Sequence, residues 1–295
     1  MELNDDYAIE PRAGLTLSLN GSQSVSAGVG LHSRHESIST YFVREYTSEN
    51  DYILPNEKLD LTKAIHYVLG YNKMFRKDVK FKTEVYYQDI FSLPVSADPT
   101  RTSSPINDVV SGETLVSKGE GVNYGIEFTF EKFFTNDYYF LFTSSIFSSK
   151  YKPLDGNWYN TRYNTGYISN IVGGKEYKLK DNKLLSVNFK FIWGGGKRDT
   201  PIDIEQMKAD DALYTFEYYI EIKRYSEKLK DYLRLDLGVS YRINKIKTAH
   251  IFSLDLQNAT FRANVAGKYY DVEKDEYYYN DMAGIIPAFN YRLEF

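Results

Sequence analysis

The 295-residue sequence contains no cysteine, which excludes a disulfide framework and any metal site built on thiolates. It also lacks a run of about eighteen apolar residues, so no helix is expected to cross a membrane. Basic residues do not outnumber acidic ones, and the net charge of −4 argues against a nucleic-acid partner. Proline and tryptophan are scarce, with 8 and 2 residues. These absences argue against nucleic-acid-binding, disulfide-stapled and helical membrane proteins.

Aromatic residues are abundant by contrast, with 28 tyrosines and 18 phenylalanines. Such a content suits the two aromatic girdles that a β-barrel places at the two interfaces of a membrane. The mean hydropathy of −0.47 does not conflict with a membrane barrel, because half of each strand and all loops are polar. The absence of cysteine agrees with an oxidising compartment such as the periplasm or the cell surface.

The last twelve residues, 284–295, show the pattern most clearly. Every second residue from Ile285 is apolar, whereas the intervening positions become polar toward the end, and a period of two assigns the two sets to opposite faces of a strand. The segment resembles the C-terminal strand of outer-membrane barrels, in which a terminal aromatic belongs to the assembly signal. This resemblance assigns that signal to Phe289, Tyr291, Leu293 and Phe295. On these residues alone, the last core strand of a soluble sandwich is the alternative.

The same alternation recurs along the chain and predicts roughly eleven strands of about ten residues each, the length that a tilted membrane strand needs. In 122–132 it turns Phe128 toward lipid and Thr129 toward water, and in 232–243 it does the same for Leu235 and Asp236. The expected fold class is therefore all-β, an antiparallel up-and-down transmembrane β-barrel segment.

The connections between the expected strands alternate between short and long. Short turns are expected at 20–22, 76–78, 133–137, 180–183 and 244–247, and long loops at 34–63, 91–121, 150–165, 195–231 and 258–283. A sandwich has no reason to sort its connections by length, whereas a membrane barrel has short periplasmic turns and long extracellular loops. The sorting therefore favours the barrel.

Several stretches resemble, in order, the second half of the barrel in TonB-dependent outer-membrane receptors, in the branch with a carboxypeptidase-regulatory-like front module. They are 9–15, 86–95, 121–127, 160–164, 173–175, 198–203 and 254–258. The resemblance implies a 22-stranded barrel, closed by an N-terminal plug domain that an inner-membrane TonB-type energy-coupling protein grips. It also implies a cell outer-membrane location and import of a bulky nutrient of the siderophore, glycan or peptide class.

Residues 1–295 are accordingly expected to be the C-terminal half of such a barrel, without the plug domain and the first barrel half. Residues 1–6 have neither the basic nor the apolar region of a signal peptide, which adds to the expectation of a truncated product that does not transport alone. The expected partners are outer-membrane lipid and the barrel-assembly machinery, with the plug and the TonB-type protein in the full-length receptor. A self-standing outer-membrane pore and a soluble or surface β-rich binding module are the alternatives.

One loop carries a candidate site for an extracellular ligand. Trp158, Tyr159 and Tyr163 alternate there with asparagines, a combination that stacks against and hydrogen-bonds sugar-like or chelate ligands. A loop packed against itself explains the same residues and is the preferred alternative.

Candidate metal ligands are less convincing. His32 and His35 form a possible pair without an evident third ligand, and His66 and His250 look like ordinary strand residues. The acidic residues of 271–281 match no calcium-loop spacing and are expected to form a solvated face. No nucleophile–base order, carboxylate pair or nucleotide motif stands out, so we expect no enzyme activity, cofactor or metal site.

Overall fold

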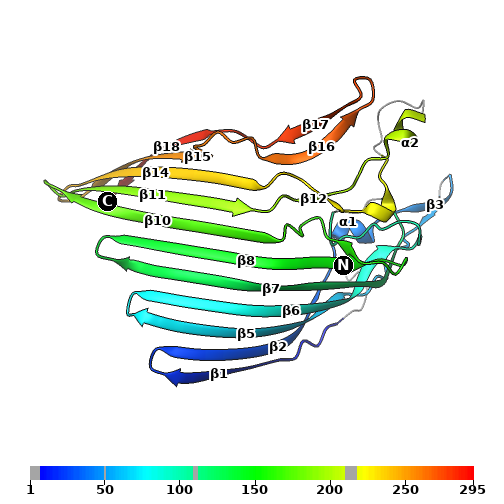
Figure 1. The fold of residues 1–295 in the computed structure, drawn as a ribbon, viewed down its shortest axis with the longest axis horizontal. Helices are drawn as coiled ribbons and strands as arrows, with labels where there is room; N and C mark the ends of the chain where they lie inside the picture. Colours follow the sequence, from blue (N-terminus) through cyan, green and yellow to red (C-terminus); the bar gives the residue numbers. More distant parts are fainter. Residues whose placement is uncertain (1–6, 50, 109–111, 210–217) are drawn as a thin grey trace.

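The computed structural model describes residues 7–49, 51–108, 112–209 and 218–295, so the expectation about residues 1–6 lies outside it. One curved antiparallel sheet dominates the described residues, and its strands follow one another in chain order (Figure 1). The eleven strands, in spatial order, are β1 (Arg12–Asn20), β2 (Gln23–Arg34), β5 (Thr62–Arg76), β6 (Val79–Ser96), β7 (Leu115–Thr135), β8 (Tyr138–Lys152), β10 (Tyr167–Leu179), β11 (Lys183–Gly194), β14 (Tyr232–Asn244), β15 (Ala249–Gln257) and β18 (Ile286–Glu294). The predicted all-β, up-and-down arrangement is confirmed.

All short turns lie at one end of the sheet, at the left in Figure 1. The β7–β8 turn has positive φ at Asn136 (54°) and Asp137 (65°), and the β10–β11 turn has positive φ at Asp181 (61°) and Asn182 (57°). Positive φ at both central residues defines the type I′ hairpin, whose twist matches that of the flanking strands. Asparagine and aspartate tolerate this conformation, which explains why the chain reverses there within two residues.

The long connections gather at the opposite end. They contain short elements, namely α1 (Ile38–Tyr41), β3 (Glu45–Ser48), β4 (Asp51–Ile53), β9 (Tyr159–Asn160), β12 (Arg198–Asp199), α2 (Ile204–Ala209), η1 (Glu221–Lys223), β13 (Glu227–Lys228), β16 (Val265–Asp271) and β17 (Glu276–Asp281). None of the helices in the described ranges is long and apolar enough to cross a membrane. Predicted loop 258–283 is corrected to a hairpin of β16 and β17, in which Tyr269 stacks on Tyr278 with ring centroids 5.4 Å apart.

The predicted loop 91–121 is also shorter than expected, because β6 continues to Ser96 and β7 begins at Leu115. Ser92 adopts a φ of 53°, and the register shifts there and again before Pro94. Bulges of this kind accommodate proline in a strand and let the strand bend. The extension buries Leu93 and Val95 completely at the loop end of the sheet.

The two faces of the sheet differ as the alternation predicts. On one face the register places Val85 opposite Ile126 and Ile126 opposite Ile146, and many large apolar side chains there are exposed. We call this the apolar face. The other, polar face carries pairs such as Lys82 with Thr129. Phe128 lies on the apolar face beside Ser144, whereas Asp236 lies on the polar face beside Lys190, so the predicted orientations are confirmed.

Aromatic side chains on the apolar face form two belts. The belt near the loops includes Tyr67 with Tyr87 and Tyr167 with Trp193, whose ring centroids lie 6.4 and 5.2 Å apart. The belt near the turns includes Phe75, which contacts Phe130 at 6.3 Å. Tyr67 and Phe75 are eight residues apart in β5, or about 26 Å at roughly 3.3 Å per residue. With the usual strand tilt of about 35–45°, this separation corresponds to roughly 20 Å along the membrane normal, close to the apolar band of about 25 Å on membrane barrels.

Candidate functional site

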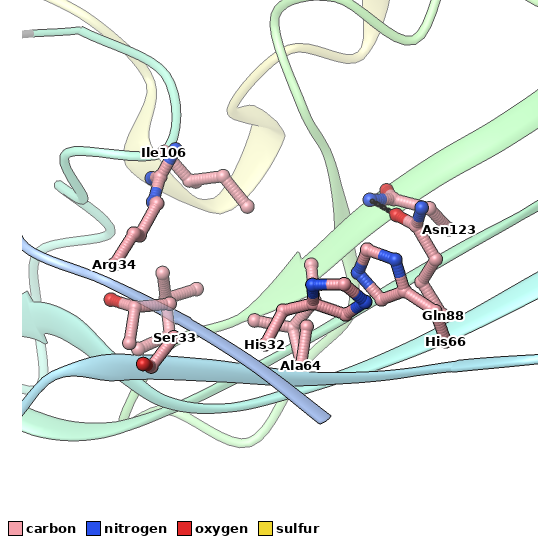
Figure 2. Close-up of a pocket in the computed structure, with 11 residues that line it drawn as sticks. His32, Ser33, Arg34, Ala64, His66, Gln88, Ile106 and Asn123 are labelled. Atoms are coloured by element: carbon pink, nitrogen blue, oxygen red, sulfur yellow. Dashed lines mark hydrogen bonds between the residues drawn. The ribbon is translucent and has the colours of Figure 1, made fainter. Parts of the chain in front are cut away.

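A row of side chains that can form hydrogen bonds crosses three neighbouring strands, β5, β6 and β7, on the polar face, close to the loop end. The register places His66 of β5 opposite Gly30 of β2 and opposite Gln88 of β6, and Gln88 lies opposite Asn123 of β7. The Asn123 side-chain amide donates a hydrogen bond of 3.0 Å to Gln88 Oε1, as Figure 2 shows. Gln88 and Asn123 line two adjacent cavities, one on each side.

The smaller cavity has a volume of about 280 Å³. His32 and His66 line it together, with ring centroids 4.3 Å apart and an interplanar angle of 32° (Figure 2). Ile90, Leu93 and Ile106 supply an apolar wall. The cavity therefore combines two imidazoles and two amides with an apolar wall, which suits a small polar or metal-bearing ligand.

The larger cavity, of about 550 Å³, is open and more polar. Glu84 and Glu127 line it from directly opposite positions in β6 and β7, and Lys82 forms an ion pair with Glu84. Tyr86 and Tyr163 also line it, together with Val68, Phe147 and Ser149. Carboxylates, amides and phenols offer both hydrogen-bond acceptors and donors, so the cavity suits a ligand rich in polar groups.

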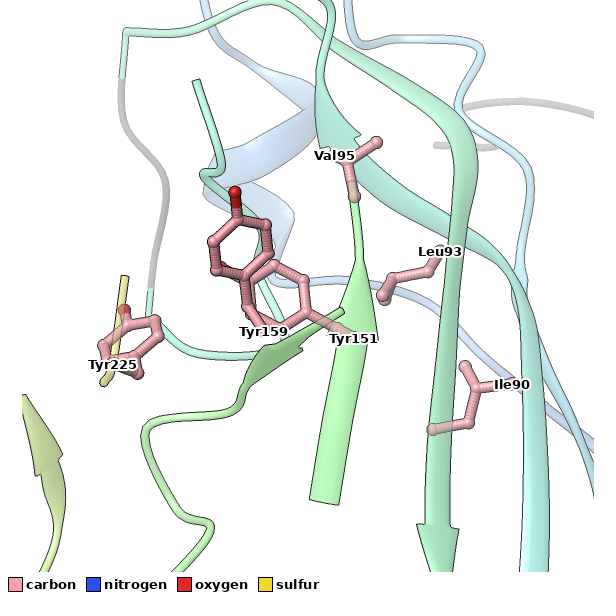
Figure 3. Close-up of a cluster of buried hydrophobic side chains, with 6 residues drawn as sticks. All are labelled: Ile90, Leu93, Val95, Tyr151, Tyr159 and Tyr225. Atoms are coloured by element: carbon pink, nitrogen blue, oxygen red, sulfur yellow. The ribbon is translucent and has the colours of Figure 1, made fainter. Parts of the chain in front are cut away.

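A buried hydrophobic cluster lies next to the smaller cavity, which two of its members also line. It consists of Ile90, Leu93, Val95, Tyr151, Tyr159 and Tyr225, and we call it the roof cluster (Figure 3). Tyr151 is completely buried, packs against Tyr159 at 6.1 Å, and donates a hydrogen bond of 2.8 Å to the carbonyl oxygen of Thr102. Glu221 in turn accepts hydrogen bonds from the backbone N–H (3.1 Å) and the hydroxyl (2.6 Å) of Thr102. These hydrogen bonds connect three chain segments, around Thr102, Tyr151 and Glu221, that are far apart in sequence.

The three aromatic residues predicted to contact a ligand occupy different environments. Tyr159 is buried in the roof cluster, and its hydroxyl donates a hydrogen bond of 2.5 Å to Asp155 Oδ2. Burial and the neighbouring Asp155 raise the pKa of Tyr159 to about 12. Trp158 is 47% exposed, and Tyr163 is 52% exposed and lines the larger cavity. Ligand contact stays a prediction for all three, and Tyr163 has the position best suited to it.

The chain before β1 is attached to the rim of the smaller cavity by Glu10. Its carboxylate accepts hydrogen bonds from the hydroxyl (2.6 Å) and the backbone N–H (2.7 Å) of Ser33 and pairs with Arg12. The bonds from the hydroxyl and then the amide of Ser33, followed by the one from Arg12, lower the pKa of Glu10 to about 2.

A depressed carboxyl pKa predicts how the stability that Glu10 contributes depends on pH. The contribution is fully present above the unfolded pKa of 4.5 and is lost as the pH falls through about 2. We therefore expect the difference in unfolding free energy between the wild type and Glu10→Gln to be constant from pH 7 to pH 5 and to vanish near pH 2. Denaturant titrations across this range measure it. A difference that disappears by pH 4 would contradict the assignment.

The remaining sequence candidates are arranged differently from the expectation. His32 faces His66 and not His35, and the Nδ1 of His250 lies 2.8 Å from the hydroxyl of Tyr291 on the apolar face. In the acidic hairpin, Asp275 pairs with Lys208, and Asp271 pairs with Lys274. Among the described residues, no group of three or more histidine, aspartate or glutamate side chains is placed to hold a metal ion.

The alternation of β6 and β7 places Glu84, Gln88, Asn123 and Glu127 on the polar face. It does not set the register between strands, so it does not identify a site. His66 was expected to be an ordinary strand residue. The signal that was available is the amide-rich and carboxylate-rich polar face of two neighbouring strands.

The four predicted assembly-signal residues all belong to the apolar face and are accessible. The exposed fractions are 73% for Phe289, 48% for Tyr291, 37% for Leu293 and 96% for Phe295. Their position agrees with recognition by another protein, which stays a prediction. β18 also forms one edge of the sheet, as β1 forms the other, because the described strands do not pair β1 with β18.

Comparison with known proteins places this sheet in a family. A family model described as "TonB dependent receptor-like, beta-barrel" matches residues 3–266. No curated protein matches the sequence. Solved structures with a similar fold include the ferric-catecholate import receptor Fiu from E. coli K12, with a TM-score of 0.59 and 14% identity. They also include the ferric preacinetobactin receptor BauA from Acinetobacter baumannii (0.60 and 14%) and P. aeruginosa FpvA bound to pyoverdines (0.60 and 13%).

The matches cover nearly all of this chain but a minor part of each receptor. The aligned region is 94% of this chain and 34% of Fiu, 95% and 35% for BauA, and 95% and 32% for FpvA. The chain thus spans about a third of the length of these receptors. At identities of 13–14% these structures establish the shared fold alone. The family match covers most of the chain, and the protein belongs to the TonB-dependent receptor family, in which its strands are those of the β-barrel.

Proposed function

We propose that this chain forms part of the wall of an outer-membrane import receptor for a bulky nutrient of the siderophore, glycan or peptide class. The observation that carries the proposal is the two-faced sheet, apolar between two aromatic belts on one side and polar with cavities on the other. A sheet of this kind needs lipid on its apolar face. The similar solved receptors named for ferric siderophores support the siderophore class among the three.

The open edges of the sheet support a barrel completed by further strands. The unpaired edges of β1 and β18 present backbone N–H and C=O groups that lipid cannot satisfy. In the proposed receptor these edges pair with other strands, a plug domain fills the lumen against the polar face, and a TonB-type protein drives import. The barrel-assembly machinery inserts the strands, reading Phe289, Tyr291, Leu293 and Phe295. The protein acts by transport and not by catalysis.

Fractionation and uptake measurements test this function. Outer membranes of cells that make the protein should contain it in a form that resists protease and changes its gel mobility on heating. Cells that also make the remaining barrel strands and the plug domain should accumulate one compound from a panel of ferric siderophores, oligosaccharides and peptides, and a protonophore should abolish the accumulation. A soluble, cooperatively melting protein would instead establish the binding-module alternative, and accumulation insensitive to the protonophore would establish the self-standing pore.

Replacing Tyr163 by alanine is expected to weaken binding of the accumulated compound about fivefold. The aromatic ring lines the larger cavity from the loop side, and stacking of this kind contributes about 1 kcal/mol. Binding to cells at 4 °C measures the change. Phe261→Ala is the matched control, because Phe261 is 69% exposed in another loop and does not line the cavity. Equal losses of binding affinity in the two variants would show that Tyr163 does not contact the ligand.

A further inference from the structure

His32 and His66 form a pair that the proposed function does not use. They come from neighbouring strands and are diagonal in the register, with His66 opposite Gly30 and His32 opposite Ala64. Glycine and alanine leave the space between them open, so the two rings approach to 4.3 Å between centroids. Both rings line the cavity of about 280 Å³ and not the outer surface.

One hydrogen-bond acceptor in the cavity wall, an amide oxygen, has no partner. Asn123 Oδ1 is buried and accepts no hydrogen bond, although the amide nitrogen of the same side chain donates to Gln88 Oε1. Buried acceptors are nearly always satisfied in folded proteins, so an orphaned one indicates a missing donor or cation. Figure 2 shows the Gln88 and Asn123 amides beside the His66 ring.

The charges near the pair permit a cation to bind. Arg34 is the only charged side chain that lines the cavity in the described part of the chain, and it is paired with Glu36 at 3.5 Å. Arg12, whose side chain reaches the adjacent Gly30, is paired with Glu10 at 2.7 Å. Each nearby guanidinium is therefore paired with its own carboxylate.

From these observations we infer that His32 and His66 bind a divalent transition metal of the Zn²⁺ type. One ring nitrogen from each histidine and an amide oxygen of the Gln88–Asn123 pair form a three-point site. Imidazole and carbonyl ligands suit Zn²⁺, Ni²⁺ and Co²⁺, whereas Ca²⁺ and Mg²⁺ prefer more oxygens. The remaining coordination position is open to water or to a donor atom of a ligand in the cavity. The site exists whether or not the protein transports anything.

Titration with Co²⁺ alone tests the site, because the visible absorption of bound Co²⁺ reports ligand number and type. The protein is taken from the outer membrane as cells make it and kept in detergent. We expect one Co²⁺ per chain, displaced by Zn²⁺, with at least thirtyfold weaker binding in His32→Gln and His66→Gln. His35→Gln and His250→Gln are the controls and should bind as the wild type does. Binding that survives the loss of both His32 and His66 would overturn the inference.

Two further measurements do not depend on removing a histidine. Asn123→Asp puts a charged oxygen where the orphaned amide oxygen lies and should tighten Co²⁺ binding at least tenfold, whereas Asn123→Leu should weaken it. X-ray absorption of the Zn²⁺-loaded wild type should show two imidazole ligands at about 2.0–2.1 Å. Oxygen ligands only, or no Co²⁺ bound at 1 mM by the folded wild type, would show that the pair does not hold a metal.

Discussion

Replacing Lys132 by methionine is expected to destabilise the protein by about 3 kcal/mol. The ammonium group is almost fully buried, with a side-chain exposure of 5%. It donates hydrogen bonds to Thr135 Oγ1 (2.7 Å) and to the carbonyl oxygens of Thr135 (2.8 Å) and Tyr138 (3.1 Å). It also lies over the ring of Tyr138 and 3.6 Å from Asp78 Oδ2.

Lys132 therefore connects two neighbouring turns, that of β7–β8 and, through Asp78, that of β5–β6. Methionine keeps the length and the apolar stem of the side chain but removes the donor. The carbonyl oxygens of Thr135 and Tyr138 then lose this donor, and Asp78 loses its counter-ion. The cost is set at the lower end of the range for broken buried pairs, because Asp78 stays partly exposed.

Urea unfolding of the detergent-solubilised protein, followed by tryptophan fluorescence, measures the change. Lys178→Met is the matched control, because Lys178 lies near the turn end of β10 and its side chain is 74% exposed. Its 2.7 Å pair with Asp137 is a surface ion pair and should contribute less than about 1 kcal/mol. Similar losses of unfolding free energy in the two variants would show that buried Lys132 contributes no more stability than a surface lysine.

The second large effect is expected from a charge on the apolar face. Val239 is 44% exposed there and lies opposite Val187 and Leu254, whereas the next residue, Ser240, lies opposite Ser186 and Ser253 on the polar face. We expect Val239→Lys to cost about 2–4 kcal/mol of insertion free energy, the value for a cation near the bilayer midplane. Ser240→Lys places the same charge in water and should cost little.

The amounts of each variant in outer membranes, and the fraction with native gel mobility before heating, report insertion. Phe128→Lys and Thr129→Lys form a second adjacent pair with the same expectation. Asp236→Lys is a poorer control than the alternation suggested, because Asp236 Oδ1 accepts hydrogen bonds from Arg234 (2.6 Å) and the backbone N–H of Asn258 (2.9 Å). Equal tolerance of lysine at Val239 and Ser240 would contradict a membrane-facing sheet.

Local features were predictable because they depend on neighbours in the sequence. The period of two assigned Phe128 and Thr129 to opposite faces, and Asn–Asp or Asp–Asn pairs produced turns where positive φ is tolerated. The predicted start of the long loop at residue 91 was wrong, because packing in the tertiary structure overruled the local sequence signals. Pro94 and Ser92 suggested a loop, yet β6 continues through them, because the bulge buries Leu93 and Val95 in the roof cluster.

The site was far less predictable than the fold. Trp158, Tyr159 and Tyr163 lie close together in sequence and were equal candidates for ligand contact. In the structure, Tyr159 is buried in the roof cluster, whereas Tyr163 lines the larger cavity. A Cβ atom on Gly195 would lie within 2 Å of the backbone carbonyl oxygen of Thr165, and one on Gly196 within 2 Å of that of Leu229. These glycines are required by close packing between loops that no local pattern specifies.

The sequence by itself determined the two-faced strands, their number and the sorting of short turns from long loops, because side-chain alternation and turn chemistry act over a few residues. Only the tertiary structure decided which polar side chains meet. His32 faces His66 and not His35, and Gln88 faces Asn123, because the inter-strand register sets these contacts across 34 and 35 residues of chain. Register depends on the hydrogen bonds and packing of whole strands, and a shift of two residues would keep every face and lose both contacts.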